Sequence, residues 1–322
     1  MNFIAASGGS GLPVVEDQLE TPFPDGTADG AAAGAVDGKA GEGGAGGRRG
    51  GSLGWRLASA LVLGPLALLL AWLGGWTFAA VTALAALQML TEWHRLTGEG
   101  RLVQPSFLVK ALLLALALAA AADDFWLTAL GLLALSLPLA GSSVLWRRDP
   151  AGTADRSFGA AAWAAGGMLY IGLAAIAFLW LRADSVRGLS VVLWLLAVVW
   201  ATDTGAFVAG RLIGGPKLAP RLSPNKTWAG LIGGIAAAGL VGALAAALSG
   251  LAPDPGLVAF SALLSLVAVA GDLTESAVKR HFGVKDAGTL IPGHGGALDR
   301  LDSLLFAAPA AALIVLLMGS GG

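Results

Sequence analysis

Long apolar segments recur along most of this chain and are separated by short polar stretches. From Trp55 onward, each apolar segment is about 17–25 residues long, enough for a helix to cross the ~30 Å hydrocarbon layer of a membrane. No interval between the segments is long enough for a soluble domain. The pattern therefore predicts an all-α fold, a polytopic helix bundle integral to a membrane. We expect about nine transmembrane helices, at 56–73, 76–91, 106–122, 125–145, 159–181, 188–209, 229–250, 256–278 and 302–319.

Residues 1–52 lack this pattern and are rich in Gly, Ala and acidic residues. They hold few large apolar side chains, so burial cannot offset the entropy lost on ordering. We expect a disordered cytoplasmic tail over 1–52 and a transmembrane domain over 53–322, of which 200–303 carries the candidate site. No basic segment leads into an apolar core near the start, as it would in a signal peptide. A tail that binds a partner is the alternative.

The amino-acid composition excludes several classes of function and of binding site. The chain is 56% hydrophobic and only 13% charged, about half the charged fraction of a soluble domain. Its net charge of −1 provides no basic field for a nucleic acid. The absence of Cys excludes disulfides and thiolate metal sites, and three His leave little room for a histidine site. Oxygen ligands remain, and these favour a hard cation such as Mg²⁺.

The basic residues indicate the orientation in the membrane, because loops on the cytoplasmic side carry an excess of Lys and Arg. With nine spans and the N-terminus inside, 18 of the 20 basic residues lie at the cytoplasmic side, and Arg182 and Arg187 lie outside. This asymmetry predicts an N-in, C-out topology. The inside set is Lys39, Arg48, Arg49, Arg56, Arg95, Arg101, Lys110, Arg147, Arg148, Arg156, Arg211, Lys217, Arg221, Lys226, Lys279, Arg280, Lys285 and Arg300.

Four polar side chains share one face of the predicted span at 256–278. Asp272, Glu275, Ser276 and Lys279 are spaced at i, i+3, i+4 and i+7, which places them in one stripe of a helix. Asp272 lies about 12 Å along the axis from Arg280, too deep for a solvated surface. An ion pair within the bundle, from Asp272 or Glu275 to Lys279, is the structural alternative to a catalytic role.

The loop after this span combines glycines with charges of both signs. Glycines at 293, 295 and 296 allow backbone amides to approach an anion, and nearby Lys and Arg side chains suit phosphate. Asp299 and Asp302 follow directly, and carboxylates of this kind hold Mg²⁺, which bridges phosphate oxygens. The segment therefore predicts metal-dependent phosphate chemistry.

A second loop, at 210–228, is short, basic and interrupted by Gly and Pro. On its own it is equally consistent with a cytoplasmic anchor and with phosphate binding. The chain contains no P-loop motif. A transporter remains the alternative from another class, because intramembrane carboxylates such as Asp203 also serve ion coupling. The clustering of charges on one membrane face argues against it.

Three segments of the C-terminal half follow a recognisable pattern. The longest covers 27 residues and reads Ser276-x-Val278-Lys279-Arg280, Lys285-Asp286-x-Gly288, then Ile291-Pro292-x-His294-Gly295-Gly296-x-x-Asp299-Arg300-Leu301-Asp302. The others are Asp203-Thr204-Gly205-Ala206-Phe207 and Ser223-Pro224-Asn225-Lys226-Thr227-Trp228. In these segments the chain resembles the phosphatidate cytidylyltransferases, also called CDP-diacylglycerol synthases.

The resemblance implies an activity. The cytidylyl group of CTP would be transferred to phosphatidate, giving CDP-diacylglycerol and pyrophosphate in phospholipid biosynthesis. It also implies Mg²⁺, with a second cation such as K⁺ as an option, and a location in the cell (inner) membrane with the site facing the cytoplasm. A homodimer is compatible with the family. A CTP-dependent enzyme acting on another membrane lipid phosphate remains an alternative.

The resemblance also implies roles for individual residues. Asp272, Lys279 and Asp299 would be catalytic, with Asp272 and Asp299 holding the metal. Four further acids would support the metal: Asp203, Glu275, Asp286 and Asp302. The residues expected to bind the two substrates are Ser223, Lys226, Ser276, Arg280, Lys285, His294, Gly295, Gly296 and Arg300.

Overall fold

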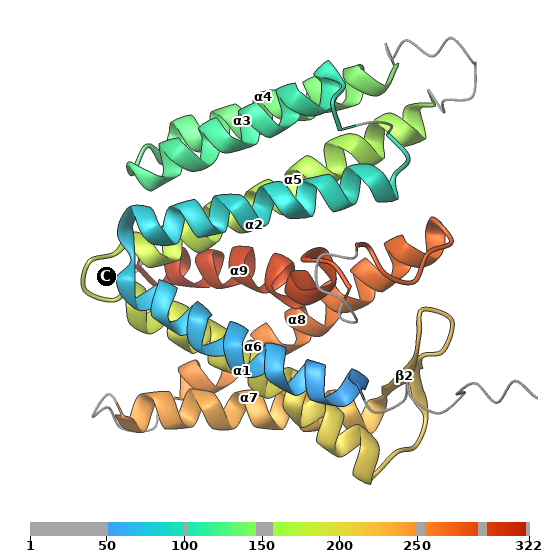
Figure 1. Ribbon diagram of the computed structural model, residues 1–322. Coiled ribbons are helices and arrows are strands. Elements are labelled where there is room, and N and C mark those ends of the chain that lie inside the picture. The colour runs from blue at the N-terminus through green and yellow to red at the C-terminus, as the bar shows by residue number, and fades with distance from the viewer. Residues whose placement is uncertain (1–50, 100–101, 146–156, 249–254, 289–294, 320–322) are drawn as a thin grey trace, which may run out of the picture. The chain divides into compact units, whose positions relative to one another are not determined.

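The computed structural model describes residues 51–99, 102–145, 157–248, 255–288 and 295–319. Within these ranges the chain forms nine helices and one two-stranded hairpin (Figure 1). The expected tail over 1–52 lies outside the described residues, except for its last two positions, where α1 begins. The helices are α1 (Gly51–Leu73), α2 (Gly75–Leu96), α3 (Pro105–Ala122), α4 (Trp126–Leu145), α5 (Phe158–Ala183), α6 (Gly188–Leu212), α7 (Trp228–Leu248), α8 (Pro255–His281) and α9 (Leu298–Gly319). The strands are β1 (Lys217–Ala219) and β2 (Ser223–Thr227).

The helices coincide with the apolar segments of the sequence. Over the described ranges, seven of them, α3 to α9, are long and apolar enough to cross a membrane. The first helix contributes a shorter apolar stretch, Val62–Leu73. The second carries polar side chains near its end, among them Glu92 and Arg95. Length and composition therefore support an integral membrane protein that is mainly helical.

The hairpin departs from the all-α prediction. β1 and β2 pair antiparallel, with Lys217 opposite Thr227 and Ala219 opposite Ser223. A helix is disfavoured here because prolines at 216, 220 and 224 provide no amide hydrogen. The Thr227 hydroxyl accepts a hydrogen bond of 3.0 Å from the amide of Gly230, which caps α7 and fixes the hairpin to it.

Glycines allow two close helix crossings. A Cβ on Gly205 would lie 2.7 Å from the carbonyl oxygen of Gly233, so α6 and α7 meet backbone to backbone. A Cβ on Gly271 would lie 2.8 Å from the carbonyl oxygen of Asp302, where α8 crosses α9. The second crossing brings Asp272 next to the first turns of α9.

More of α5 is buried than of any other candidate span in the described chain. Its buried side chains extend from Ala161 to Leu181, and it contacts α2, α3, α4, α6 and α9. Figure 1 shows α2 running alongside it. Helix α5 is thus the central element against which the site-bearing helices pack.

A buried ion cluster joins α2 to α3. Lys110 is one of the basic residues that the predicted topology puts on the cytoplasmic side. It is only 1% exposed. Its ammonium contacts the Glu99 carboxylate and lies 3.3 Å from Nδ1 of His94. Burial alone would raise the pKa of Glu99, but the hydrogen bond with His94 and the charge of Lys110 outweigh it and hold that pKa below its ordinary 4.5. Lys110 is therefore a packing residue of the bundle.

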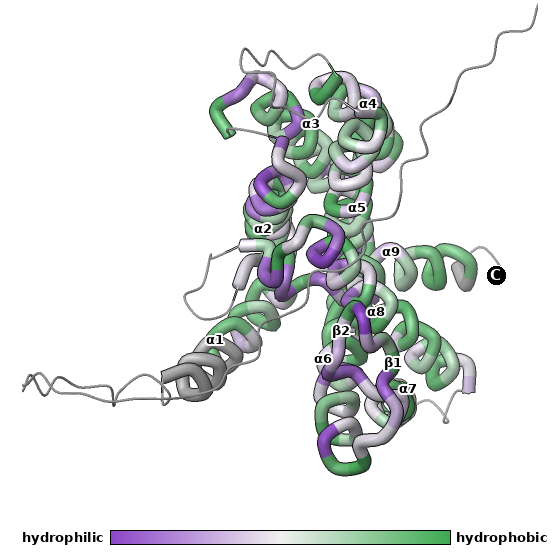
Figure 2. Tube along the Cα trace, turned by 90° about the vertical axis from the view of Figure 1, so that its right-hand side faces the viewer, coloured by the Kyte–Doolittle hydropathy of each residue, from purple (hydrophilic) through white to green (hydrophobic). Residues whose placement is uncertain are grey.

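Polar segments interrupt a mostly hydrophobic bundle. Figure 2 shows hydrophilic segments in the hairpin and in the neighbouring parts of α2, α6 and α8, and others around α3. The segments in the hairpin, α6 and α8 contain residues singled out by the sequence.

Candidate functional site

The first turn of α9 is held by a carboxylate from α2, 205 residues earlier in the chain. Glu92, 1% exposed, accepts hydrogen bonds from the amides of Ala297 (2.9 Å) and Leu298 (2.8 Å). The Gln88 amide group donates to the same carboxylate at 2.9 Å. The first amides of a helix have no partner within it, and a negative charge suits that end. Glu92 therefore caps α9 and fixes the start of the helix in space.

Asp299 faces back toward the loop that precedes α9. Its Oδ2 accepts hydrogen bonds from the amides of Gly296 (2.8 Å) and Ala287 (3.0 Å). Gly295 has φ +81°, and a Cβ there would lie 2.7 Å from the same oxygen, so this position requires glycine. Asp299 thus ties the described ends of the loop to α9. The Gly296 amide, expected to approach a phosphate, donates to Asp299 here.

Lys279 bridges α8 and α9. Its Nζ lies 2.5 Å from Oε2 of Glu275 and donates a 2.8 Å hydrogen bond to Oδ1 of Asp299. The ion pair between Glu275 and Lys279 that the helical spacing offered as an alternative is present. The contact with Asp299 goes beyond it, because it ties the polar stripe of α8 to the first turn of α9. Buried charge pairs of this kind fix geometry more than they add stability.

Lys226 and Asp272 form a further ion pair of the site. Lys226, on β2, lies with Nζ 2.6 Å from Oδ2 of Asp272, and both side chains are 26% exposed. The Ser276 hydroxyl donates to Oδ1 of Asp272 at 3.5 Å, a weak contact. The hairpin therefore reaches over the stripe on α8 and presents a lysine to it.

Further acidic side chains surround this pair. Asp302, one turn into α9, interacts electrostatically with Asp272 and with Asp203 on α6. The Tyr170 hydroxyl, on α5, is subject to the charges of Asp302, Glu275 and Asp272. It is buried and has no hydrogen-bond partner among the described residues. An unsatisfied buried hydroxyl beside carboxylates is a group available to a ligand.

The charge balance of the cluster fits a bound cation. Five carboxylates, at 203, 272, 275, 299 and 302, meet two ammonium groups, at 226 and 279. The Glu275 carboxylate is 1% exposed and pairs with Lys279. Oxygen donors in excess of positive charge suit Mg²⁺. In the described parts of the chain no three His, Asp or Glu side chains are close enough to enclose a metal unaided.

The remaining predicted residues lie around this centre. Ser223 begins β2, and the Arg280 Nε donates to the carbonyl of Leu222 at 3.5 Å, so the end of α8 points to the hairpin turn. His294 lies outside the described residues. Three charged side chains are exposed near the loop ends: Lys285, Asp286 and Arg300.

Two residues around the candidate site were not identified from the sequence. Glu92 directly follows the predicted span at 76–91, and Tyr170 lies within the predicted span at 159–181. A signal existed for each of them. Glu92 is an acid at the boundary of a predicted span, and Tyr170 is the single Tyr of the chain. Neither signal identifies the partner, which is distant in sequence.

Comparisons with known proteins show the family of the chain. The model of the cytidylyltransferase family matches residues 55–318. Phosphatidate cytidylyltransferase of Brucella suis biovar 1 (strain 1330) is 40% identical over 257 residues, covering 79% of this chain and 89% of the relative. The protein of the same name from Staphylococcus haemolyticus (strain JCSC1435) is 35% identical over 253 residues, 76% of this chain and 92% of the relative. That from Bacillus subtilis (strain 168) is 44% identical over 143 residues, 44% of this chain and 53% of the relative. With its site assembled from the segments that carry the resemblance, and with this match over most of its length, the chain belongs to the cytidylyltransferase family.

Proposed function

We propose that the chain is a phosphatidate cytidylyltransferase, which converts CTP and phosphatidate into CDP-diacylglycerol and pyrophosphate. One observation carries the proposal. Three segments that lie far apart in the sequence meet through Asp203, Lys226 and Asp272, at a polar region of an otherwise apolar bundle. The names of the relatives support the same activity.

The reaction makes limited demands on the protein. A phosphate oxygen of the lipid attacks the α-phosphorus of CTP, and the bond from that phosphorus to the bridging oxygen of the β-phosphate breaks. Pyrophosphate leaves with the bonding electrons. The lipid phosphate is already nucleophilic, so no strong base is needed. Catalysis depends on in-line positioning and on charge stabilisation of the leaving group.

The ammonium groups of the site match this need. Lys226 and Lys279 are each held by carboxylates, which fixes the position of the ammonium groups before phosphate arrives. Arg280, Lys285 and Arg300 lie at the rim and are assigned to the phosphates of CTP and of the lipid. Ser223, Ser276, His294, Gly295 and Gly296 complete the proposed binding set.

A magnesium ion belongs to the proposal because of the excess of carboxylates. Asp272 would hold it, supported by Asp203, Asp302 and Glu275. When bound, it would neutralise charge on the phosphate oxygens. Asp299, also assigned to the metal by the resemblance, already accepts two amides and Lys279. These three donors occupy most of the roughly four lone-pair sites of the carboxylate and leave little room for a metal ion. A second cation such as K⁺, and Asp286 as an outer ligand, remain part of the prediction.

The orientation also belongs to the proposal. Nine spans with the N-terminus inside place the site at the cytoplasmic face of the inner membrane, where CTP is available. Phosphatidate reaches the same site from the bilayer. A homodimer, compatible with the family resemblance, is checked by the mass of the protein in detergent.

The test is a turnover assay on the full chain, purified in detergent, with radiolabelled CTP, phosphatidate and Mg²⁺. We expect a lipid-soluble cytidine label that disappears when EDTA is added. Asp272→Asn should lower turnover about 100-fold or more, because it removes the carboxylate that is proposed to hold the metal and that positions Lys226.

Asp184→Asn is the matched control. Asp184 is exposed between α5 and α6, where its carboxylate accepts amides from Val186 and Arg187. An asparagine keeps that acceptor, so this variant should retain activity. A folded wild-type protein that labels no phosphatidate would refute the activity. An active Asp272→Asn variant would remove this residue from the site.

A further inference from the structure

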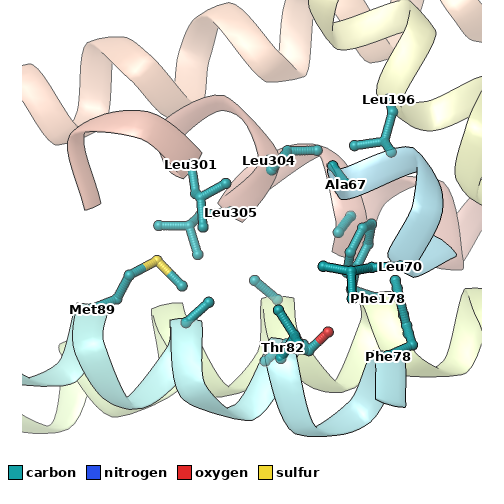
Figure 3. Close-up of a pocket in the computed structure, with 15 residues that line it drawn as sticks. Ala67, Leu70, Phe78, Thr82, Met89, Phe178, Leu196, Leu301, Leu304 and Leu305 are labelled. Atoms are coloured by element: carbon teal, nitrogen blue, oxygen red, sulfur yellow. The ribbon is translucent and has the colours of Figure 1, made fainter. Parts of the chain in front are cut away.

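An apolar cavity of about 190 Å³ lies between α1, α2, α5, α6 and α9 (Figure 3). Phe78 and Met89 line it from α2, Phe178 from α5, and Leu301 and Leu305 from α9. Among the described residues that line it, only Thr82 carries a hydroxyl group. A nucleobase or phosphate would lose its hydrogen bonds here, so the cavity suits hydrocarbon.

The cavity adjoins the polar site through shared helices. Met89 precedes Glu92 by three residues on α2, and Leu305 follows Asp302 by three on α9. Residues three apart lie on the same side of a helix, about 4.5 Å apart along its axis. The polar site and the cavity are therefore consecutive along α2 and α9.

The dimensions of the cavity suit one lipid chain. Phe78 and Met89, the first and last residues of α2 in the lining, are 11 residue steps apart, about 16.5 Å at 1.5 Å per residue. This is close to half of the ~30 Å hydrocarbon layer, the thickness of one leaflet. Its volume exceeds the ~150 Å³ of an engineered apolar cavity that binds benzene.

We propose that this cavity receives one acyl chain of the lipid phosphate on which the enzyme acts. The inference rests on the proposed function and extends it to the position of the lipid tail. A chain that moves from the bilayer into the cavity exchanges one apolar environment for another, so little affinity is gained. What the cavity provides is alignment. A tail held along α9 keeps its phosphate next to Asp302 and restricts its rotation.

The test compares phosphatidates of different chain length on Ala85→Phe. Ala85 lines the cavity, and a phenyl group there would fill part of it. We expect kcat/KM for dihexadecanoyl phosphatidate to fall about tenfold or more, since misplacement of a substrate by about 1 Å has effects of this size. The value for dihexanoyl phosphatidate and the KM for CTP should change less than threefold. Leu84→Phe is the control, because Leu84 is 67% exposed and does not line the cavity.

Equal loss on both lipids, or no loss on either, would overturn the proposal for the cavity while leaving the activity established. A second measurement does not depend on turnover. Wild-type protein is irradiated with a phosphatidate that carries a diazirine at the end of one acyl chain, and the labelled peptides are identified by mass spectrometry. We expect label in the helices that line the cavity, which are α1, α2, α5, α6 and α9. Label confined to α3, α4, α7 and α8 would refute the cavity assignment, even if the wild type proved inactive.

Discussion

Glu92 is a buried carboxylate whose partners are backbone amides. It bonds to two amides at the start of α9, so its position determines where the residues of that first turn lie. Asp299 and Asp302 belong to the first turns of α9. Asp299 contacts Lys279 on α8, and Asp302 lies within electrostatic range of Asp272 on α8 and Asp203 on α6. Glu92 is therefore a positioning residue for the site, although it touches none of the proposed reacting groups.

Two replacements of Glu92 should distinguish its effect on stability from its effect on activity. Glu92→Ala leaves two buried amides without an acceptor, at about 1–3 kcal/mol of unfolding free energy each. Glu92→Gln keeps one acceptor but loses the charge, and we expect its turnover to fall about tenfold or more because α9 is misplaced. Thermal unfolding in detergent and the turnover assay measure the two effects.

Gln88→Ala provides the control for Glu92. It removes one donor to the carboxylate and leaves both amides of α9 bonded. Its turnover should stay close to that of the wild type. If Glu92→Gln were as active as this variant, the charge of Glu92 would have no part in positioning α9.

The buried cluster of Glu99, His94 and Lys110 predicts a pH dependence of stability. The pKa of Glu99 is lowered in the folded protein, so the folded state binds fewer protons at this group than the unfolded state. Its stabilising effect is complete above pH 4.5 and is lost as the pH falls below that value. We expect the melting temperature in detergent to decline there, and to decline less in Glu99→Gln.

A second variant tests the same cluster at neutral pH. Lys110→Met leaves the buried Glu99 carboxylate without its cation, a loss of about 3–5 kcal/mol. If Glu99→Gln and the wild type shared one acid profile, another carboxylate would be responsible for the pH dependence.

The sequence could identify the site residues whose partners are near them in the chain. Asp272, Glu275 and Lys279 share one helical face, and the structure confirms the ion pair between the last two. The pairs of Lys226 with Asp272 and of Glu92 with the start of α9 depend on tertiary packing. The periodicity of the sequence does not predict these two contacts. Each contact joins two elements whose relative placement is determined by other contacts.

At the scale of elements, the crossing of α8 and α9 determines how far Asp272 on α8 lies from Asp302 on α9. Gly271 permits it, since its missing side chain leaves room for the carbonyl of Asp302. The crossing places Asp272 and Asp302 within electrostatic range of each other.

Gly271→Ala should therefore reduce activity more than stability. The added methyl group meets a backbone oxygen at 2.8 Å, which cannot rotate away, so α9 must shift. We expect turnover to fall about tenfold or more, as for other small misplacements near a reacting group. Gly166→Ala on α5, with no atom within 4 Å of its Cβ, is the control and should stabilise the helix by about 0.5–1 kcal/mol. Equal activity of the two variants would contradict the argument.

Helix boundaries show where apolar length ceases to predict structure. The last span was predicted from residue 302, whereas α9 begins at Leu298. Its polar first turn is helical because Glu92 accepts a hydrogen bond from the amide of Leu298. Asp299 accepts one from the amide of Gly296 in the preceding loop. The hairpin was not predicted either, since prolines and polar residues indicate only that a helix is absent.

At the scale of the whole molecule, charge and hydropathy predict an orientation that remains to be tested. Because the chain has no Cys, single cysteines provide clean reporters of sidedness. Val186→Cys, in the exposed segment between α5 and α6, should react with a membrane-impermeant maleimide in intact cells. Lys217→Cys on β1 should react with the maleimide only after the membrane is permeabilised. The reverse pattern would place the site on the outer face and would overturn the topology.

The hydrogen bonds between Glu92 and α9 have a consequence for how the protein is made. At about 5–20 residues per second, the ribosome needs about 10–40 s to add the 205 residues that separate Glu92 from Ala297. Throughout that time α2 carries a carboxylate whose final partners do not yet exist, and such a group is costly in lipid. The hydrogen bonds between Glu92 and α9 therefore cannot form until the last helix has been synthesised. A truncated chain that ends before α9 would enter the membrane without the hydrogen bonds between Glu92 and α9. We therefore expect prematurely terminated chains to be inactive and to be degraded preferentially by membrane proteases.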